Sequence, residues 1–84
     1  MNKPEWKHII KSRGESWLIQ SGRIGIILTD SHNDYPGIFV LHCGTFRIDT
    51  MPLNAKNPDD AKAESLQIIK QKLDELNQNF QDLN

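Results

Sequence analysis

An amphipathic stretch near the carboxyl end most constrains what this chain can fold into. Six large apolar residues there are spaced by 3, 4, 3, 4 and 3 positions: Leu66, Ile69, Leu73, Leu76, Phe80 and Leu83. This spacing predicts a helix over residues 57–82 with a narrow apolar stripe, a pattern that suits packing against a partner helix. Its start is marked by Asn57 as a capping residue, Pro58 in the first turn and the acidic Asp59 and Asp60 beside them.

The predicted helix is longer than a small sheet. Residues 58–82 span about 37 Å as a helix, whereas strands of six or seven residues span about 20 to 23 Å. We therefore expect Leu66, Ile69 and Leu73 to cover the sheet. The remaining residues, Leu76, Phe80 and Leu83, extend past its edge. Either this end frays at residues 77–79 and Phe80 folds back on the domain, or the three residues form the seam of a homodimer.

Residues 15–50 have the alternating pattern of an antiparallel sheet of three or four strands. Ser21 and Gly22 predict a hairpin turn between strands, residues 30–37 form a polar loop, and residues 38–41 form a buried strand. Gly44 either turns the chain into a fourth strand over residues 45–50 or forms a bulge within one long strand.

Residues 1–14 are predicted to form a short N-terminal helix, with Trp6 and Ile9 on one face and Pro4 at its start. The alternative is an irregular arm that lays Trp6 on the sheet. The expected class is α+β, as a single domain over residues 1–84 in which the long C-terminal helix packs on one face of the sheet.

Charge is divided unevenly along the chain. The net charge is −1, but residues 1–56 hold seven basic and five acidic residues (+2), and residues 57–84 hold three and six (−3). Nucleic-acid binding proteins usually show a clustered basic excess. Direct nucleic-acid binding through the open sheet, with Trp6, Tyr35, Arg23 and Arg47 as contacts, is therefore the less favoured alternative.

A single cysteine, Cys43, excludes an intrachain disulfide and fits a reducing compartment. No apolar run approaches the length that spans a bilayer. A cytoplasmic protein without a membrane association is expected.

The candidates for chemistry are few. They are Asp30, His32, Asp34, His42 and Cys43, and none has the spacing of a known metal or nucleophilic site. We expect no catalytic residue, no metal and no cofactor, and hence a protein that is not an enzyme.

The order of a helix, an antiparallel sheet and a long last helix is similar to that of double-stranded RNA-binding domains. In that family the last helix opens with basic residues that contact phosphates. Residues 57–62 instead carry Asp59 and Asp60, and only Lys62 matches. The resemblance therefore implies a topology and not an RNA-binding activity.

The build also resembles small accessory proteins of phages and mobile elements, including anti-CRISPR inhibitors. Residues 14–19, the segment 38–48 and the acidic helix carry this resemblance. It implies an inhibitor or regulator that occludes a surface on a protein partner, such as a complex that handles nucleic acid. The predicted contacts are Tyr35, Arg23 and Arg47, or else an acidic row that mimics phosphates: Asp59, Asp60, Glu64, Asp74 and Glu75.

Overall fold

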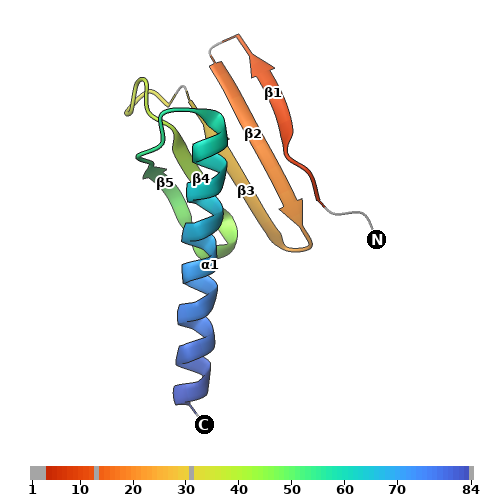
Figure 1. The fold of residues 1–84 in the computed structure, drawn as a ribbon, viewed down its shortest axis with the longest axis vertical. Helices are drawn as coiled ribbons and strands as arrows, with labels where there is room; N and C mark the ends of the chain where they lie inside the picture. Colours follow the sequence, from red (N-terminus) through yellow and green to blue (C-terminus); the bar gives the residue numbers. More distant parts are fainter. Residues whose placement is uncertain (1–3, 13, 31, 84) are drawn as a thin grey trace.

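Five antiparallel strands precede one long helix in the computed structural model, which describes residues 4–12, 14–30 and 32–83 (Figure 1). The elements are β1 (Lys7–Lys11), β2 (Gly14–Ser21), β3 (Ile24–Thr29), β4 (Val40–Cys43), the short 3₁₀ helix η1 (Gly44–Phe46), β5 (Ile48–Pro52) and α1 (Pro58–Asp82). Strands that follow one another along the chain are neighbours in the sheet, in the order β1-β2-β3-β4-β5. The predicted α+β class with an antiparallel sheet and a long last helix is confirmed.

The predicted N-terminal helix is wrong, and the sheet has five strands instead of three or four. Lys7–Lys11 form the edge strand β1, which pairs with β2 from Lys7 opposite Leu18 to Lys11 opposite Gly14. The adjacent β-branched Ile9 and Ile10 favour a strand, and Gly14, with φ of 138°, allows the chain to reverse direction. Residues 1–3 and 13 of the predicted helix lie outside the described residues. The similarity to double-stranded RNA-binding domains depended on a first helix, and Lys7–Lys11 form a strand in its place.

Both predicted turns in the sheet are present. Ser21 pairs with Ile24 around a tight turn in which Gly22 has φ of 58°, which confirms the first hairpin. At Gly44 the chain makes the short helix η1 and returns as a separate strand, β5, so the alternative of one long bulged strand is wrong. A register shift lies between Leu41 and Cys43 where β4 pairs with β5.

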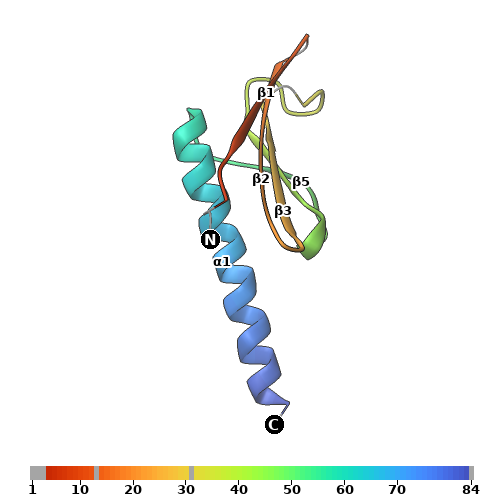
Figure 2. The same ribbon diagram turned by 90° about the vertical axis from the view of Figure 1, so that its right-hand side faces the viewer.

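The helix packs on one face of the sheet (Figure 2). Alternate residues of the strands point toward it, and the cross-strand row Trp17, Leu28 and Leu41 forms the centre of the core. All three side chains are buried. Burying large apolar side chains is the main favourable term in folding, so this row fixes which face of the sheet α1 covers.

The start of α1 is as predicted, but its contact face is not. The Asn57 side chain caps the helix by accepting a hydrogen bond from the backbone N–H of Asp60 at 2.9 Å. The residues of α1 buried against the sheet are Ala61, Ser65 and Ile69. Leu66 and Leu73, which we expected in the core, are 45% and 39% exposed. Small side chains at 61 and 65 let the helix approach the strands closely along that line, and Leu66 and Leu73 lie on its flank.

Within the described residues, no helix has both the length and the apolar character needed to cross a bilayer.

Candidate functional site

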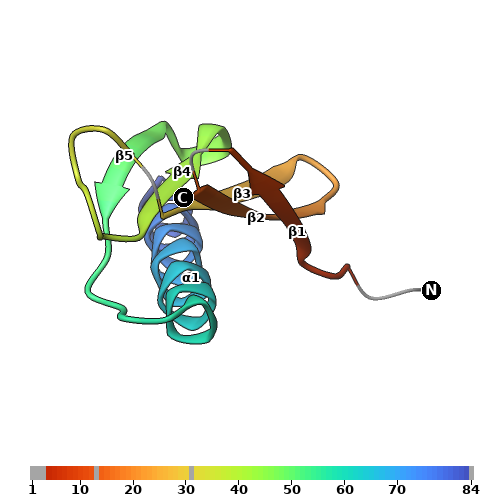
Figure 3. The same cartoon turned by 90° about the horizontal axis from the view of Figure 1, so that it is seen from above.

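The sheet is wider than the helix that covers it. Five strands spaced by about 4.8 Å make a sheet about 19 Å wide, whereas a helix with its side chains is about 10 to 12 Å across. Seen from above, α1 lies beneath the β3 to β5 side and leaves the β1 side beyond it (Figure 3). An apolar groove of about 330 Å³ follows that flank of the helix. It is lined mainly by Ile19, Ile24 and Ile26 of the sheet and by Leu66, Ile69 and Leu73 of the helix.

The far end of α1 projects past the sheet as a continuous helix (Figure 1). Leu76, Phe80 and Leu83, called here the distal stripe, are 55%, 65% and 84% exposed. The alternative in which this end frays and Phe80 folds back on the domain is wrong, because α1 runs unbroken to Asp82. The seam of a homodimer stays a prediction, and the structure leaves its three residues accessible.

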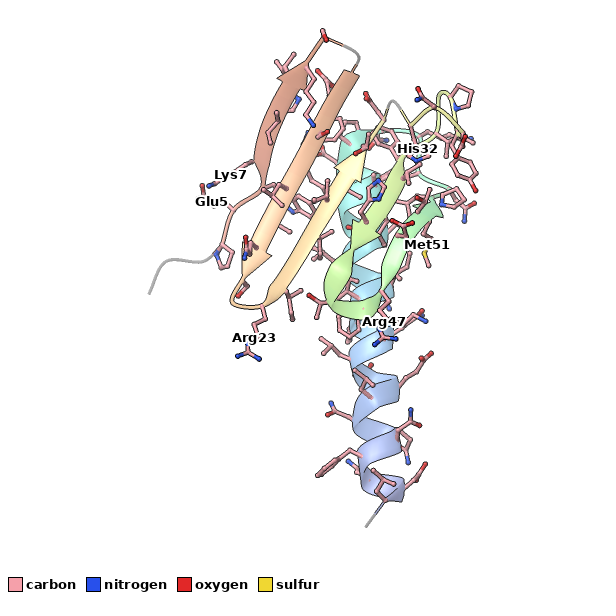
Figure 4. The ribbon with its side chains drawn as sticks, turned by 180° about the vertical axis from the view of Figure 1, so that it is seen from behind. Glu5, Lys7, Arg23, His32, Arg47 and Met51 are labelled. Carbon is pink, nitrogen blue, oxygen red and sulfur yellow. The ribbon has the colours of Figure 1, made fainter. Side chains whose placement is uncertain are left out.

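Arg23 and Arg47, predicted as partner contacts, lie at the same end of the sheet (Figure 4). Arg23 is in the turn between β2 and β3, and Arg47 follows η1. The two turns are joined because the Thr45 hydroxyl donates a hydrogen bond to the carbonyl oxygen of Arg23 at 2.6 Å. Both arginines are exposed, and neither forms an ion pair with another described residue. The structure therefore places two cations on the same end of the sheet (Figure 4).

Tyr35 lies in the loop between β3 and β4, away from the two arginines. Its ring centroid is 5.7 Å from that of His32, and the His32 ring is 6.0 Å from that of His42 on β4. The loop is closed by a hydrogen bond from the Tyr35 N–H to the His32 carbonyl oxygen at 3.1 Å. The sequence did not predict this cluster. The only signal for it was the alternation along β4, which puts His42 on the face away from α1.

Three of the five acids in the predicted acidic row have a partner within the chain. Asp60 accepts a hydrogen bond from the Asn57 side-chain amide at 3.0 Å, and Glu64 accepts hydrogen bonds from the backbone N–H groups of Asn54 and Ala55. Asp59 lies 3.9 Å from the Lys62 ammonium. Asp60 and Glu64 thus hold the start of the helix. A role for these acids in partner binding stays a prediction.

The face of the sheet opposite α1 is not covered by the helix (Figure 2). The row Lys7, Leu18, Ile27 and His42 runs across four strands on this face, by the pairing of β1 to β4. Ile27 is 42% exposed, and Ile9, on the same face of β1, is 40% exposed. We call this surface, defined by Lys7, Ile9, Leu18, Ile27 and His42, the open face. Because Ile9 was predicted to lie in a helix, its position on the open face was not predicted from the sequence.

Two residues considered for chemistry or stacking lie on the helix side. Trp6 packs against the core, with the Lys62 ammonium 5.9 Å from the centre of its ring, so it does not project from the open face. Cys43 is 1% exposed. Among the described residues, no group of three or more His, Cys, Asp or Glu side chains is arranged to hold a metal ion.

No protein-family model matches this chain, and neither the curated proteins nor the solved structures contain a match. Its function is therefore argued from its own surfaces.

Proposed function

We propose that the protein is a non-enzymatic protein-binding module that places the open face of its sheet on a macromolecular partner and occludes that partner's surface, in the manner of a phage-type inhibitor or regulator. The observation that carries it is the exposure of Ile27, on the middle strand of a face that the helix does not cover, together with that of Ile9 on the edge strand of the same face. Large apolar side chains exposed together, with polar residues around them, are typical of protein interaction sites.

The size of the open face shows what else must contribute. The strands have between four and eight residues, so a sheet about 19 Å wide and about 18 Å long offers roughly 350 Å². Each partner in a standard interface contributes about 800 Å². The turns at the two ends of the sheet supply the missing area. Arg23 and Arg47 lie at one end and Tyr35 at the other, and arginine and tyrosine are enriched among the residues that dominate binding energy.

Arg47 supplies a second line of support. Its φ of 58° is in the left-handed region, and among the described residues it is the only one other than glycine with a positive φ. This conformation costs an arginine on the order of 1 kcal/mol or more and costs glycine little. The Arg47 backbone N–H bonds to the Gly44 carbonyl oxygen, but a glycine would make that bond equally well. A role for the guanidinium group in binding explains why arginine stands there.

The test uses matched charge substitutions on the two sides of the molecule. Tagged wild type, Ile27→Asp and Gln71→Asp are used to capture proteins from a lysate of the organism that encodes the chain. Gln71 is an exposed residue of α1, so its variant has the same added charge on a surface outside the open face. We expect one partner to be retained by wild type and Gln71→Asp and lost by Ile27→Asp. Equal capture by all three folded proteins would contradict the proposal.

The nucleic-acid alternative is tested with the same proteins. Proteins that read nucleic acid with a sheet place aromatic rings on it, whereas this open face exposes Ile9 and Ile27, and Trp6 lies on the helix side. We therefore expect no shift of labelled single- or double-stranded nucleic acid at low salt. A salt-dependent shift that Arg23→Ala and Arg47→Ala abolish would establish the alternative instead.

A further inference from the structure

We propose that the chain forms an antiparallel, two-fold symmetric dimer in which the distal stripe of each α1 enters the apolar groove of the other copy. The two surfaces are complementary in kind. The groove is an apolar hollow between β2, β3 and α1, and the distal stripe is an apolar ridge that stays 55% to 84% exposed on its own chain. Because each copy carries one groove and one ridge, a two-fold pairing satisfies both at once.

The spacing of the apolar residues fits this pairing. Intervals of 3, 4, 3, 4 and 3 read the same from either end, so an antiparallel second copy matches every residue of the stripe. Leu66 meets the partner's Leu83, and Leu73 meets the partner's Leu76. The partner's Phe80 falls at the level of Ile69, which lines the groove but is itself buried against the sheet. Leu66, Ile69 and Leu73 line the groove. The match therefore brings the partner's distal stripe into the groove.

The charges along α1 select the antiparallel direction. Residues 66–72 carry Lys70 and Lys72 and no acid, whereas residues 73–83 carry only acids, at Asp74, Glu75 and Asp82. An antiparallel pair lays the basic segment of each helix along the acidic segment of the other, and Lys70 lies at the groove itself. A parallel pair would lay like charges together, which is unfavourable in paired helices.

The exposed apolar surface of the stripe is large enough for a biological interface. Five stripe residues are exposed by between 39% and 84%. At about 200 Å² for a fully exposed large apolar side chain, these fractions leave roughly 580 Å² of apolar surface on each chain. Two copies would remove about 1,150 Å² from water, above the about 1,000 Å² expected of a biological interface. Because half of α1 projects past the sheet (Figure 2), the antiparallel pair would have its two sheets at opposite ends.

The first test is the molar mass in solution by light scattering. We expect a dimer for wild type and for Gln71→Asp at ~100 μM protein, and a monomer for Phe80→Asp, whose side chain is exposed in a single chain and so does not hold the fold. Ile27→Asp, the variant that tests the open face, is expected to remain a dimer, so a failure of target binding is distinguished from a failure of pairing. A monomeric wild type at this concentration, or a dimeric Phe80→Asp, overturns the proposal.

The second test reports the direction of pairing. With about 1.5 Å of rise per residue, two copies of residue 73 lie about 4.5 Å apart along the helix axes in the antiparallel pair, and two copies of residue 83 lie about 25 Å apart. A short bifunctional maleimide should therefore link Leu73→Cys to itself and leave Leu83→Cys unlinked. Wild type is the control, since Cys43 is buried. Linkage of Leu83→Cys with equal yield would show a parallel pair and overturn the proposal.

Charge complementation tests the specific contact between ridge and groove. Leu83→Glu and Leu66→Lys should each be monomeric alone, because each puts a charge into both symmetric contacts. Mixed together, they should recover a dimer, because the glutamate of one chain then meets the lysine of the other. Failure of the mixture to dimerise, with both proteins folded by circular dichroism, contradicts the matching of Leu66 with the partner's Leu83.

Discussion

Glu64 accepts a hydrogen bond from the backbone N–H of Ala55 at 2.9 Å, across the segment that joins the sheet to the helix. The same carboxylate also accepts from the Asn54 N–H at 3.0 Å. These bonds tie the chain before α1 to the second turn of the helix. Since Leu53 is buried in the core next to them, the carboxylate helps to set the position at which α1 crosses the sheet.

Removing the Glu64 carboxylate should therefore destabilise the fold. Glu64→Ala leaves two backbone donors without their partner, and hydrogen bonds to a charged group contribute about 1.5 to 3 kcal/mol. Because the site is only half-buried and water can replace part of the loss, we expect the free energy of unfolding to fall by about 1 to 2 kcal/mol, measured by urea denaturation. Glu75→Ala, on the exposed part of α1, is the matched control. Equal midpoints for the two variants would contradict the structural role of Glu64.

Two neighbouring residues on β3 should lose very different amounts of stability on truncation. Leu28 is fully buried and Ile27, on the open face, is 42% exposed. Leu28→Ala should lower the free energy of unfolding by about 2 to 5 kcal/mol, because it leaves a cavity in the core, and Ile27→Ala by less than about 1 kcal/mol. Thermal unfolding followed by circular dichroism compares them. If Ile27→Ala were the more destabilising, the assignment of the two faces of the sheet would be wrong.

Capping residues, prolines and glycines predicted the helix start and the turn that depend on interactions within a few residues of the chain. Asn57 and Pro58 located the start of α1 because capping and a fixed proline φ act within one turn, and Gly22 located the first hairpin because its left-handed φ requires glycine. The strand β1 was missed because the spacing of Trp6, Ile9 and Ile10 fits a helix as well as a strand. Its pairing with β2, a contact between segments, decides the outcome.

The helix stripe shows where sequence periodicity stops being informative. The 3-4 spacing identified the apolar residues of α1 correctly, but it could not show which side of the stripe meets the sheet. Ala61 and Ser65 decide that, since small side chains permit the close approach. The groove beside Leu66 follows from this choice, because its sheet wall is formed by residues of β2 and β3. Arg23 and Arg47 were named from sequence, but the hydrogen bond from Thr45 that joins their turns was visible only in three dimensions.

The cap at Asn57 should be worth a measurable share of the stability. Its side chain accepts from the Asp60 N–H at 2.9 Å and donates to the Asp60 carboxylate at 3.0 Å. Asn57→Ala removes both bonds, and loss of an N-cap costs about 0.5 to 2 kcal/mol. Urea denaturation should show a fall of about 1 kcal/mol, whereas Asn77→Ala, in the exposed half of α1, should leave the midpoint unchanged or slightly raised. No difference between the two would mean that α1 does not depend on this cap.

Arg47 allows stability and binding to be separated in one residue. Arg47→Gly relieves an arginine held at φ of 58°, which favours the folded state by about 1 kcal/mol or more, and it also increases the entropy of the unfolded chain, which offsets about 0.5 to 1 kcal/mol. The free energy of unfolding should therefore stay the same or rise by up to about 1 kcal/mol, while capture of the partner weakens because the guanidinium group is gone.

Arg47→Ala keeps the strained backbone and also loses that group, so it should weaken capture equally without the gain in stability. Unchanged capture by both variants would remove Arg47 from the proposed binding surface, and a marked loss of stability in Arg47→Gly alone would show that the arginine is held there by contacts within the fold.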